Sequence, residues 1–315
     1  MSKSDLVELK QLRYFTHVAE FASFTKAANY LDISASVLSR QIRKLEVDLG
    51  KTLLIRDGRG VVLTESGYIL LEHCRKILVA MDHAVEAVTD AQLSGNVSLG
   101  FPPTLARYFS VPIIQTFHEL MPKAKLRVIE ESTVSIEESI ITGRLDMGLI
   151  YNPIHAQDLD LVFLLKECLY LIAPKKMPLK TDNEGISLRE VAKLPLILPA
   201  YPNGHRRLIE TEMIKSACKP NLILEVNSVR TMFELVAAST GCTIFSQKGI
   251  DLLPKEDRSK VQMHKIYSSE LITNLYIATS NKRMMTQTEK TLSKIIRNLC
   301  EQHFSIVDQR LESNF

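Results

Sequence analysis

Hydroxyl and guanidinium side chains recur at helical spacing in a short stretch near the N-terminus. They are Ser36, Ser39, Arg40 and Arg43. The apolar residues between them, Leu38, Ile42 and Leu45, have the spacing of the opposite helix face. Hydroxyl and guanidinium groups donate hydrogen bonds to base edges in the major groove and to phosphates. The pattern favours a helix that contacts DNA, although a solvated polar face is the alternative that these residues alone leave open.

The charge distribution supports the same interpretation. Between Ser34 and Gly60 the chain has six Lys and Arg against three Asp and Glu, a surplus of three that equals the net charge of +3 of all 315 residues. Two of these arginines, Arg56 and Arg59, flank a predicted turn and would reach a phosphate or the minor groove. A local basic patch on a near-neutral chain is typical of a DNA-binding module joined to another domain.

A second group of residues falls where predicted strands end and helices begin. It consists of Pro103, Thr104, Thr133, Tyr151, Pro202, Asn203, Gly204, Asn227, Ser228 and Ser246. Unpaired N–H groups at helix N-termini, together with hydroxyls, bind small anions. Open α/β sheets bind ligands at the carboxyl ends of their strands. As a set these residues predict a site for a small polar or carboxylate metabolite, whereas any single one could be a helix cap or a turn residue.

The N-terminal elements that would position the first group are three helices and two strands. Apolar residues at steps of three and four predict a helix from Leu9 to Ala22 and a short second helix around Ala27. The third would begin at Ser34 as N-cap and end at Gly50. Short β-prone runs at 53–55 and 61–63 then predict a wing. The expected fold is an all-α winged helix-turn-helix over 8–66, with the helix-turn-helix motif at 23–42.

A long helix should follow, capped by Thr64. Its apolar positions alternate in steps of four and three, which is a heptad seam. They are Leu70, Cys74, Ile77, Met81, Ala84, Val88 and Ala91. A narrow seam on so long a helix favours a linker and dimerisation helix at 67–93; packing of the helix on its own domain is the alternative.

Beyond a hinge at Gly95 the sequence alternates between strand and helix patterns. Expected strands are 97–101, 125–131, 146–151, 161–173, 196–198, 222–226, 242–245 and 271–278. Expected helices cover 112–121, 136–142, 231–239 and 288–302. This alternation predicts an α/β domain with mainly parallel sheets and helices on both faces. The last residues, 305–315, are expected to form a frayed tail.

Several classes of protein are disfavoured. The five scattered cysteines include no CxxC pair, which argues for reduced thiols and against a structural zinc site. The N-terminus lacks the apolar stretch of a signal peptide, and no apolar run is long enough to span a membrane, so we expect a cytoplasmic protein. The isolated histidines show no metal spacing, and no nucleophile or phosphate-binding motif is present. We therefore expect no catalytic residue, no metal and no cofactor.

The N-terminal stretch resembles the DNA-binding domain of the LysR-type transcriptional regulators. The matching positions are Leu12, Phe15, Val18, Ala19, Glu20, Ser23, Phe24, Thr25, Ala27, Ala28, Leu31, Ser34, Leu38, Ser39, Arg40, Gln41, Ile42, Leu45, Glu46, Leu49, Gly50, Leu53, Arg56, Arg59, Leu63, Thr64 and Gly67. The resemblance adds Ser23, Thr25 and Ser34 to the residues expected to contact DNA. Two departures stand out. Where the family usually has Gln followed by Pro or Ser, this chain has Ala35 followed by Ser36, and the loss of the Gln puts one base contact in doubt. Leu54 replaces a usual Phe.

The resemblance extends more weakly over the rest of the chain. GRLDMGLIY, LPLILP and EEST are similar to the nitrogen assimilation control branch of that family. The resemblance to the family implies a periplasmic-binding-protein-like effector domain at 95–300, with one subdomain at 95–166 and 268–300 and the other at 167–267. Double-stranded operator DNA and self-association into a dimer, and further into a dimer of dimers, are the implied partners; a contact with RNA polymerase stays open. The rival interpretations are a metabolite-binding transport protein and an enzyme of α/β architecture.

Overall fold

The computed structural model describes residues 7–57, 60–88, 95–267 and 271–311. The chain divides into an N-terminal unit, which takes in residues 1–92 and 142–144, and a C-terminal unit, which takes in residues 93–141 and 145–315. No helix among the described residues is both long enough and apolar enough to cross a membrane.

The N-terminal unit begins with the three expected helices, α1 (Leu9–Phe21), α2 (Phe24–Tyr30) and α3 (Ala35–Leu49). The hydroxyl of Ser34 caps α3 by accepting a hydrogen bond from the N–H of Val37, and Gly50 ends it in the left-handed conformation, with φ of 67°. Phe15, Val18 and Leu45 are fully buried between the helices. The prediction of a helix-turn-helix is confirmed.

The wing is a hairpin of β1 (Leu54–Asp57) and β2 (Gly60–Leu63), in which Leu54 lies opposite Leu63. The carboxylate of Glu46 in α3 accepts hydrogen bonds from the N–H groups of Leu53 and Leu54, at 2.8 and 3.2 Å. These bonds fix the start of the hairpin against α3. The turn at Gly58 and Arg59 lies outside the described residues.

Helix α4 (Glu65–Val88) begins at Thr64, whose hydroxyl accepts a hydrogen bond from the N–H of Gly67 at 3.0 Å. The apolar residues of the predicted seam are buried in the first half of α4 and exposed in the second half. Cys74 is fully buried in the core of the N-terminal unit, whereas Ile77 and Met81 are 44% and 42% exposed. The first half of the seam therefore packs on its own domain, and the second half presents apolar side chains at the surface. Residues 89–93 of the predicted linker helix lie outside the described residues.

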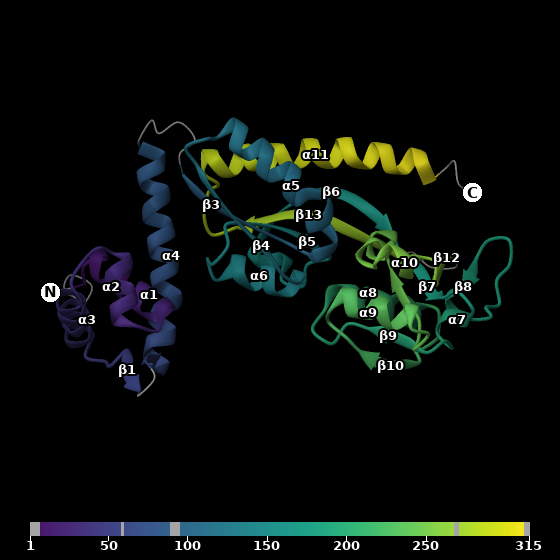
Figure 1. Cartoon of the computed structure of the whole chain (residues 1–315), viewed down its shortest axis with the longest axis horizontal. Coiled ribbons are helices and arrows are strands. Elements are labelled where there is room, and N and C mark those ends of the chain that lie inside the picture. Colours follow the sequence, from purple (N-terminus) through teal and green to yellow (C-terminus); the bar gives the residue numbers. More distant parts are fainter. Residues whose placement is uncertain (1–6, 58–59, 89–94, 268–270, 312–315) are drawn as a thin grey trace. The chain divides into compact units, whose positions relative to one another are not determined.

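The C-terminal unit contains a five-stranded first sheet with the order β4-β3-β5-β13-β6 (Figure 1). Its strands are β3 (Asn96–Phe101), β4 (Lys125–Glu130), β5 (Met147–Tyr151), β6 (Leu159–Cys168) and β13 (Ile272–Ser280). Strand β3 is parallel to β4 and β5, whereas β13 is antiparallel to β5 and β6. Helices α5 (Pro103–Leu120) and α11 (Gln287–Leu311) pack against one face, and α6 (Thr133–Ile141) packs against the other.

Close approach of α6 to the first sheet requires a residue without a side chain. A Cβ atom at Gly148 would lie 2.3 Å from Cγ2 of Ile136, a distance at which one of the two atoms must shift. Ile136 and Ile140 fill this side of the sheet, while Phe109 of α5 and Leu292 of α11 fill the opposite side. The two apolar layers hold the N-termini of α5 and α6 at the carboxyl ends of β3 and β5.

The second sheet has the order β11-β7-β12-β8, and a parallel pair of strands, β9 and β10, lies beside it. The strands are β7 (Tyr170–Pro174), β8 (Ile186–Ser187), β9 (Leu196–Leu198), β10 (Leu222–Glu225), β11 (Thr243–Phe245) and β12 (Val261–Tyr267). The accompanying helices are α7 (Leu188–Val191), α8 (Gly204–Lys215), α9 (Val229–Ala237), α10 (Lys255–Arg258) and the 3-10 helix η3 (Gln247–Leu252). A second 3-10 helix, η2 (Ala156–Asp158), lies between β5 and β6 of the first sheet.

Four expectations about the C-terminal unit need correction. The sheets are mixed rather than mainly parallel, because the chain leaves the first sheet through β6 and re-enters it through β13. The expected strand at 161–173 is two strands, which lie in different sheets and are separated at Leu169. Strand β12 and helix α8 were not anticipated, since both carry charged residues within a weak apolar pattern. Helix α11 continues to Leu311, past the start of the tail expected at 305.

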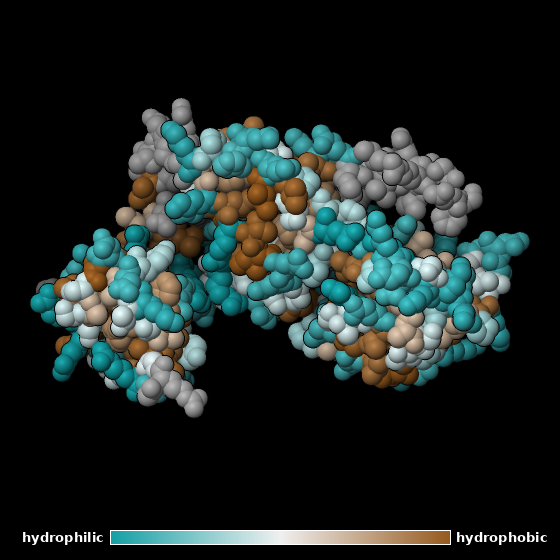
Figure 2. Space-filling view, viewed as in Figure 1, coloured by the Kyte–Doolittle hydropathy of each residue, from teal (hydrophilic) through white to brown (hydrophobic). Residues whose placement is uncertain are grey.

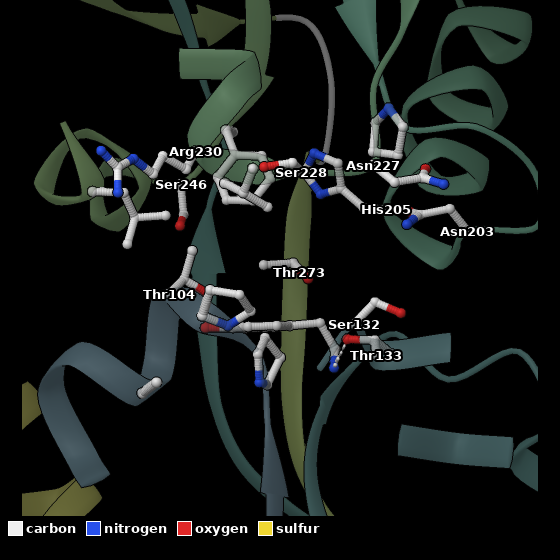
Figure 3. Close-up of a pocket in the computed structure, with 18 of the residues that line it drawn as sticks. Thr104, Ser132, Thr133, Asn203, His205, Asn227, Ser228, Arg230, Ser246 and Thr273 are labelled. Carbon is white, nitrogen blue, oxygen red and sulfur yellow. Dashed lines mark hydrogen bonds between the residues drawn. The ribbon is translucent and has the colours of Figure 1, made fainter. Parts of the chain in front are cut away.

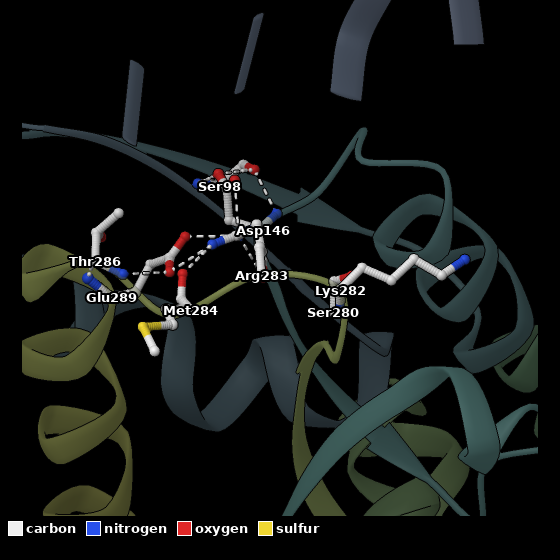
Figure 4. A network of polar contacts seen from close by, with 8 residues as sticks. All are labelled: Ser98, Asp146, Ser280, Lys282, Arg283, Met284, Thr286 and Glu289. Atoms are coloured by element: carbon white, nitrogen blue, oxygen red, sulfur yellow. Dashed lines mark hydrogen bonds and ion pairs between the residues drawn. The ribbon is translucent and has the colours of Figure 1, made fainter. Parts of the chain in front are cut away.

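A buried polar network joins the first sheet to the start of α11 (Figure 4). The guanidinium of Arg283 donates to the carboxylate of Asp146 at 3.2 Å and to both carboxylate oxygens of Glu289 at 2.8 and 2.7 Å. Asp146 in turn accepts hydrogen bonds from the N–H and hydroxyl of Ser98, at 2.8 and 2.6 Å. The side chain of Glu289 is 1% exposed, so its charge depends on Arg283 for neutralisation.

Replacement of Arg283 by alanine should destabilise the C-terminal unit, because it leaves the buried carboxylate of Glu289 without its counter-charge. We expect a loss of about 3 kcal/mol in the free energy of unfolding, measured by urea denaturation followed by circular dichroism. Arg297→Ala is the matched control, since Arg297 is an exposed arginine of α11. Equal stability of the two variants would contradict this role of the network.

Candidate functional site

The polar face of α3 carries two arginines that are available for a ligand. Arg40 and Arg43 are exposed, and neither guanidinium has an ion-pair or hydrogen-bond partner in the described part of the chain. By contrast, the neighbouring Lys44 pairs with Glu8 at 2.8 Å. Ser36 is exposed and Ser39 is half-buried beside them. The face predicted to contact DNA thus has uncompensated positive charge and hydroxyl donors together.

The other predicted DNA-contacting residues frame this face. Ser23 caps α2 by accepting a hydrogen bond from the N–H of Lys26 at 3.3 Å, and Thr25 is exposed in the first turn of that helix. Ser34 contacts the hydroxyl of Ser36 at 3.0 Å. The exposed guanidinium of Arg56 lies 4.9 Å from the centre of the Phe24 ring, which places the base of the wing at the start of α2. Arg59 lies outside the described residues.

A cavity of about 750 Å³ opens between elements of the first and second sheets. Nine of the ten residues predicted to bind a small ligand line it, and Pro202 does not. Figure 3 shows Thr104 and Thr133 on one wall and Asn203, Ser228 and Ser246 on the opposite wall. The walls come from residues far apart in the sequence.

Four helices begin at the cavity: α5, α6, α8 and α9. Asn203 and Ser228 cap α8 and α9 by accepting hydrogen bonds from the N–H groups of Arg206 and Thr231, at 3.1 and 3.2 Å. Helix α5 has no side-chain cap, because its N-cap residue is Pro102. Since helix N-termini carry partial positive charge, their convergence favours an anionic group in the cavity.

The wall formed by 199–204 is held by an almost buried arginine. Arg206 donates to the carbonyl of Pro199 at 2.9 Å and forms ion pairs with Glu210 and Glu225, both at 2.6 Å. A Cβ atom at Gly204 would lie 2.2 Å from the carbonyl oxygen of Asn152, so this position accommodates only glycine. These contacts set the distance between the start of α8 and the end of β5.

The floor of the cavity contains a chain of buried polar groups. The hydroxyl of Tyr151 donates to the carboxylate of Glu167 at 3.0 Å, and Lys248 pairs with the same oxygen atom. Burial and the charge of Glu167 raise the pKa of Tyr151 well above its usual value, so its proton stays in place. Thr273 accepts a hydrogen bond from the side-chain amide of Asn152 at 2.9 Å.

His205 lines the cavity in its neutral form. Its Nε2 lies 2.8 Å from the carbonyl oxygen of Ile244, which can only accept, so Nε2 carries the proton. Desolvation lowers the pKa of His205 to about 4, although the hydrogen bond to Ile244 opposes this effect. The ring also lies 4.7 Å from that of Phe245. His205 therefore contributes an aromatic surface and no positive charge at neutral pH.

Several lining residues were not anticipated from the sequence. They are Ala106, Arg107, Ser110, Glu130, Glu131, Ser132, Glu167, Leu169, Pro199, Val229, Arg230, Phe245, Leu252 and Thr273. Ser132 was open to detection, because it precedes Thr133 at the start of a predicted helix. Glu167 and Thr273 lie on β6 and β13, and no local pattern indicates that these strands pass beneath the cavity. Within the described ranges, no group of three or more His, Cys, Asp or Glu residues could hold a metal ion.

The neutral state of His205 predicts an acid-side loss of stability. Its pKa is lower in the folded than in the unfolded chain, so its contribution is complete above about pH 6.5 and is lost as the pH falls towards 4. We expect the free energy of unfolding to fall by roughly 2 kcal/mol more between pH 7 and pH 5 in the wild type than in His205→Gln. Urea titrations at both pH values measure this difference, and identical pH profiles would rule out His205 as the cause.

Comparison with known proteins places both units. Residues 9–68 match the family model of the bacterial regulatory helix-turn-helix proteins of the lysR family, and residues 90–301 match the LysR substrate binding domain. The nitrogen assimilation regulatory protein nac of Klebsiella aerogenes is 31% identical over 244 residues, covering 76% of this chain and 79% of nac. AlsR of Bacillus subtilis, a helix-turn-helix transcriptional regulator, is 31% identical over 242 residues, covering 75% of this chain and 80% of AlsR.

Solved structures agree in fold. A full-length variant of OxyR from Pseudomonas aeruginosa superimposes with a TM-score of 0.71 at 21% identity, covering 93% of this chain and 94% of OxyR. Full-length CbnR in complex with its target DNA has a TM-score of 0.62 at 20% identity, covering 93% of this chain and all of CbnR (100%). The named relatives are transcription regulators rather than enzymes, as the absence of a catalytic motif led us to expect. The chain belongs to the LysR family of DNA-binding transcription regulators, with an N-terminal helix-turn-helix domain and a C-terminal effector-binding domain.

Proposed function

We propose that α3 reads operator DNA in the major groove and that a small molecule in the cavity changes how the protein binds that DNA. The observation that carries the first half is the pair of exposed guanidinium groups of Arg40 and Arg43 on the outer face of α3, which have no partner among the described residues. Ser36 and Ser39 supply hydroxyl donors next to them. Arg56, and Arg59 beyond the described residues, would contact the phosphate backbone from the wing.

Ser23, Thr25 and Ser34 would fix the protein against the backbone. Each lies at or next to the N-terminus of α2 or α3, where backbone N–H groups and hydroxyls bind phosphates. Ala35 lacks a polar side chain at the first position of α3. We expect this protein to discriminate less strongly at the base pair that a glutamine would contact there.

Arg40→Ala should weaken operator binding by roughly tenfold to a hundredfold, because an arginine contact to a base edge or phosphate is worth about 1–3 kcal/mol. The measurement is fluorescence anisotropy with DNA from upstream of the protein's own gene, in a salt series with nonspecific competitor. Arg297→Ala is the control, since it removes an exposed arginine of the C-terminal unit. Wild-type affinity in Arg40→Ala would exclude α3 as the reading helix.

The protein would bind as a dimer to an imperfect palindrome, with two DNA-binding domains in successive major grooves. Ile77, Met81 and Val85 form an exposed apolar stripe on α4, at 44%, 42% and 46% exposure. Such a stripe on a long helix favours pairing with a second copy.

Met81→Glu should lower the oligomeric mass measured by sedimentation equilibrium, because it places a charge in the proposed helix pair. Met284→Glu serves as the matched control: Met284 is 91% exposed on a loop of the C-terminal unit. If Met81→Glu retains the wild-type mass, α4 is not the dimer interface.

A dimer of dimers needs a second surface for self-association. The C-terminal unit exposes apolar side chains on β10, where Ile223 and Leu224 are 41% and 39% exposed, and Figure 2 shows this hydrophobic patch. Val111 of α5 is 60% exposed as well. Exposed apolar patches on a soluble unit mark interaction sites. These surfaces support the proposal of a tetramer.

The effector site would use Pro103, Thr104, Thr133, Tyr151, Asn203, Gly204, Asn227, Ser228 and Ser246, with the subdomains divided at 166/167 and 267/268. Support comes from their common position around one cavity whose walls belong to different sheets. A ligand that contacts both walls would favour one relative orientation of the sheets, and the population of DNA-bound states would shift with it. We place this activity in the cytoplasm, where such a regulator meets its DNA; a contact with RNA polymerase would belong to activation.

A further inference from the structure

The cavity contains two kinds of polar group. One kind favours a ligand group that accepts hydrogen bonds, and the other favours a positively charged group. The first kind consists of neutral donors. Thr104 and Ser246 are 4% and 6% exposed, and neither hydroxyl has a hydrogen-bond partner in the described part of the chain. Figure 3 shows them on facing walls, next to the uncapped start of α5. Both residues line the cavity, so their hydroxyls are available to a ligand that accepts hydrogen bonds.

The second kind consists of carboxylates. Glu131 is half-buried at the end of β4, lines the cavity, and has no ion pair or hydrogen bond through its side chain to any described residue. Its backbone N–H donates to the carbonyl of Phe101 at 3.3 Å. This contact places Glu131 next to Pro102, the residue that begins the path into α5 and Thr104. The unpaired carboxylate of Glu131 and the hydroxyl of Thr104 therefore line the same cavity from chain segments that are neighbours.

The cations around the cavity do not offset Glu131. Lys248 is paired with Glu167. The side chain of Arg230 is 67% exposed and pairs with Glu234 at 2.9 Å. Arg107 is exposed and lines the cavity, as does the exposed carboxylate of Glu130, so these two opposite charges leave the charge of Glu131 uncompensated. Even with its Oε1 bound to Tyr151 and Lys248, Glu167 retains a buried Oε2 atom without a partner among the described residues. A purely anionic ligand would meet uncompensated negative charge, and a purely cationic ligand would leave the hydroxyls unpaired.

We propose that the effector is an α-amino acid, with its carboxylate bound by Thr104, Ser246 and the N-terminus of α5, and its ammonium group bound by Glu131. This proposal rests on the proposed effector role of the cavity. An α-amino acid carries a carboxylate for the hydrogen-bond donors and an adjacent ammonium group for the carboxylate of Glu131. The volume of about 750 Å³ leaves room for its side chain.

The test is titration calorimetry and thermal unfolding of the full-length protein with the L-amino acids. Each amino acid that binds is compared with the matched carboxylic acid that lacks the amino group and the matched amine that lacks the carboxyl group. We expect at least one amino acid to bind about tenfold or more tightly than either analogue, the loss expected when a hydrogen bond to a charged group is removed.

Two variants locate the charges. Glu131→Gln should weaken the amino acid about tenfold and leave the deaminated acid unchanged or tighter, because only the ammonium contact is lost. Thr104→Val should weaken both ligands. Glu119→Gln, an exposed glutamate of α5 outside the cavity, should change neither.

The outcomes separate this inference from the proposed function. Equal binding of an amino acid and its deaminated acid, or an unchanged affinity in Glu131→Gln, would overturn the zwitterion assignment. Binding of dicarboxylates or sugar phosphates but of no amino acid, with loss in Thr104→Val, would overturn it as well and leave the effector site standing. If no amino acid, carboxylate or sugar phosphate binds, both the inference and the effector role of the cavity fail.

Discussion

The C-terminal unit depends on the pairing of two strands. Strands β6 and β13 are antiparallel neighbours from Leu159 opposite Ser280 to Cys168 opposite Ile272. One carries the chain out of the first sheet towards β7, and the other brings it back after β12. The residues that form the cavity floor, Glu167 and Thr273, lie on these same strands. Any group that binds at the floor therefore contacts the connection between the two sheets directly.

Electrostatics around this connection is balanced by short-range pairs. Lys248 neutralises Glu167, and Arg206 is held by Glu210 and Glu225 behind the opposite wall. Such almost buried pairs add little net stability, but removal of one partner is costly. These pairs hold segments next to the cavity, at which α5, α6, α8 and α9 begin. Among the cavity groups that these pairs leave over, the hydroxyls of Thr104 and Ser246 and the carboxylate of Glu131 are the ones proposed to bind the ligand.

The N-terminal domain was largely predictable, because its signals are local. Ser34 and Gly50 mark the ends of α3, and the apolar residues between them have helical spacing. The positions of Thr104 and Ser228 at helix starts could be predicted for the same reason. The cavity floor could not be, since Glu167 and Thr273 meet only through pairing of strands that are far apart in the sequence. The mixed sheets follow from the same crossing, which no local pattern encodes.

The heptad spacing of α4 does not determine what covers its apolar face. The heptad spacing is continuous in the sequence, yet Cys74 is buried in its own domain while Ile77 and Met81 are exposed. Spacing indicates which face of a helix is apolar but not which element packs on that face. Helix α1 packs on the first half of α4 only. We propose that a second copy of the chain covers the exposed second half.

Hydroxyl-radical footprinting on a DNA segment recovered by genome-wide selection tests the central claim, that α3 of paired subunits reads operator DNA. If it does, protection should centre on two major-groove half-sites of an imperfect palindrome, about one helical turn of 10–10.5 base pairs or a multiple of it apart. Protection without symmetry, or no protection by folded, dimeric protein, would contradict it.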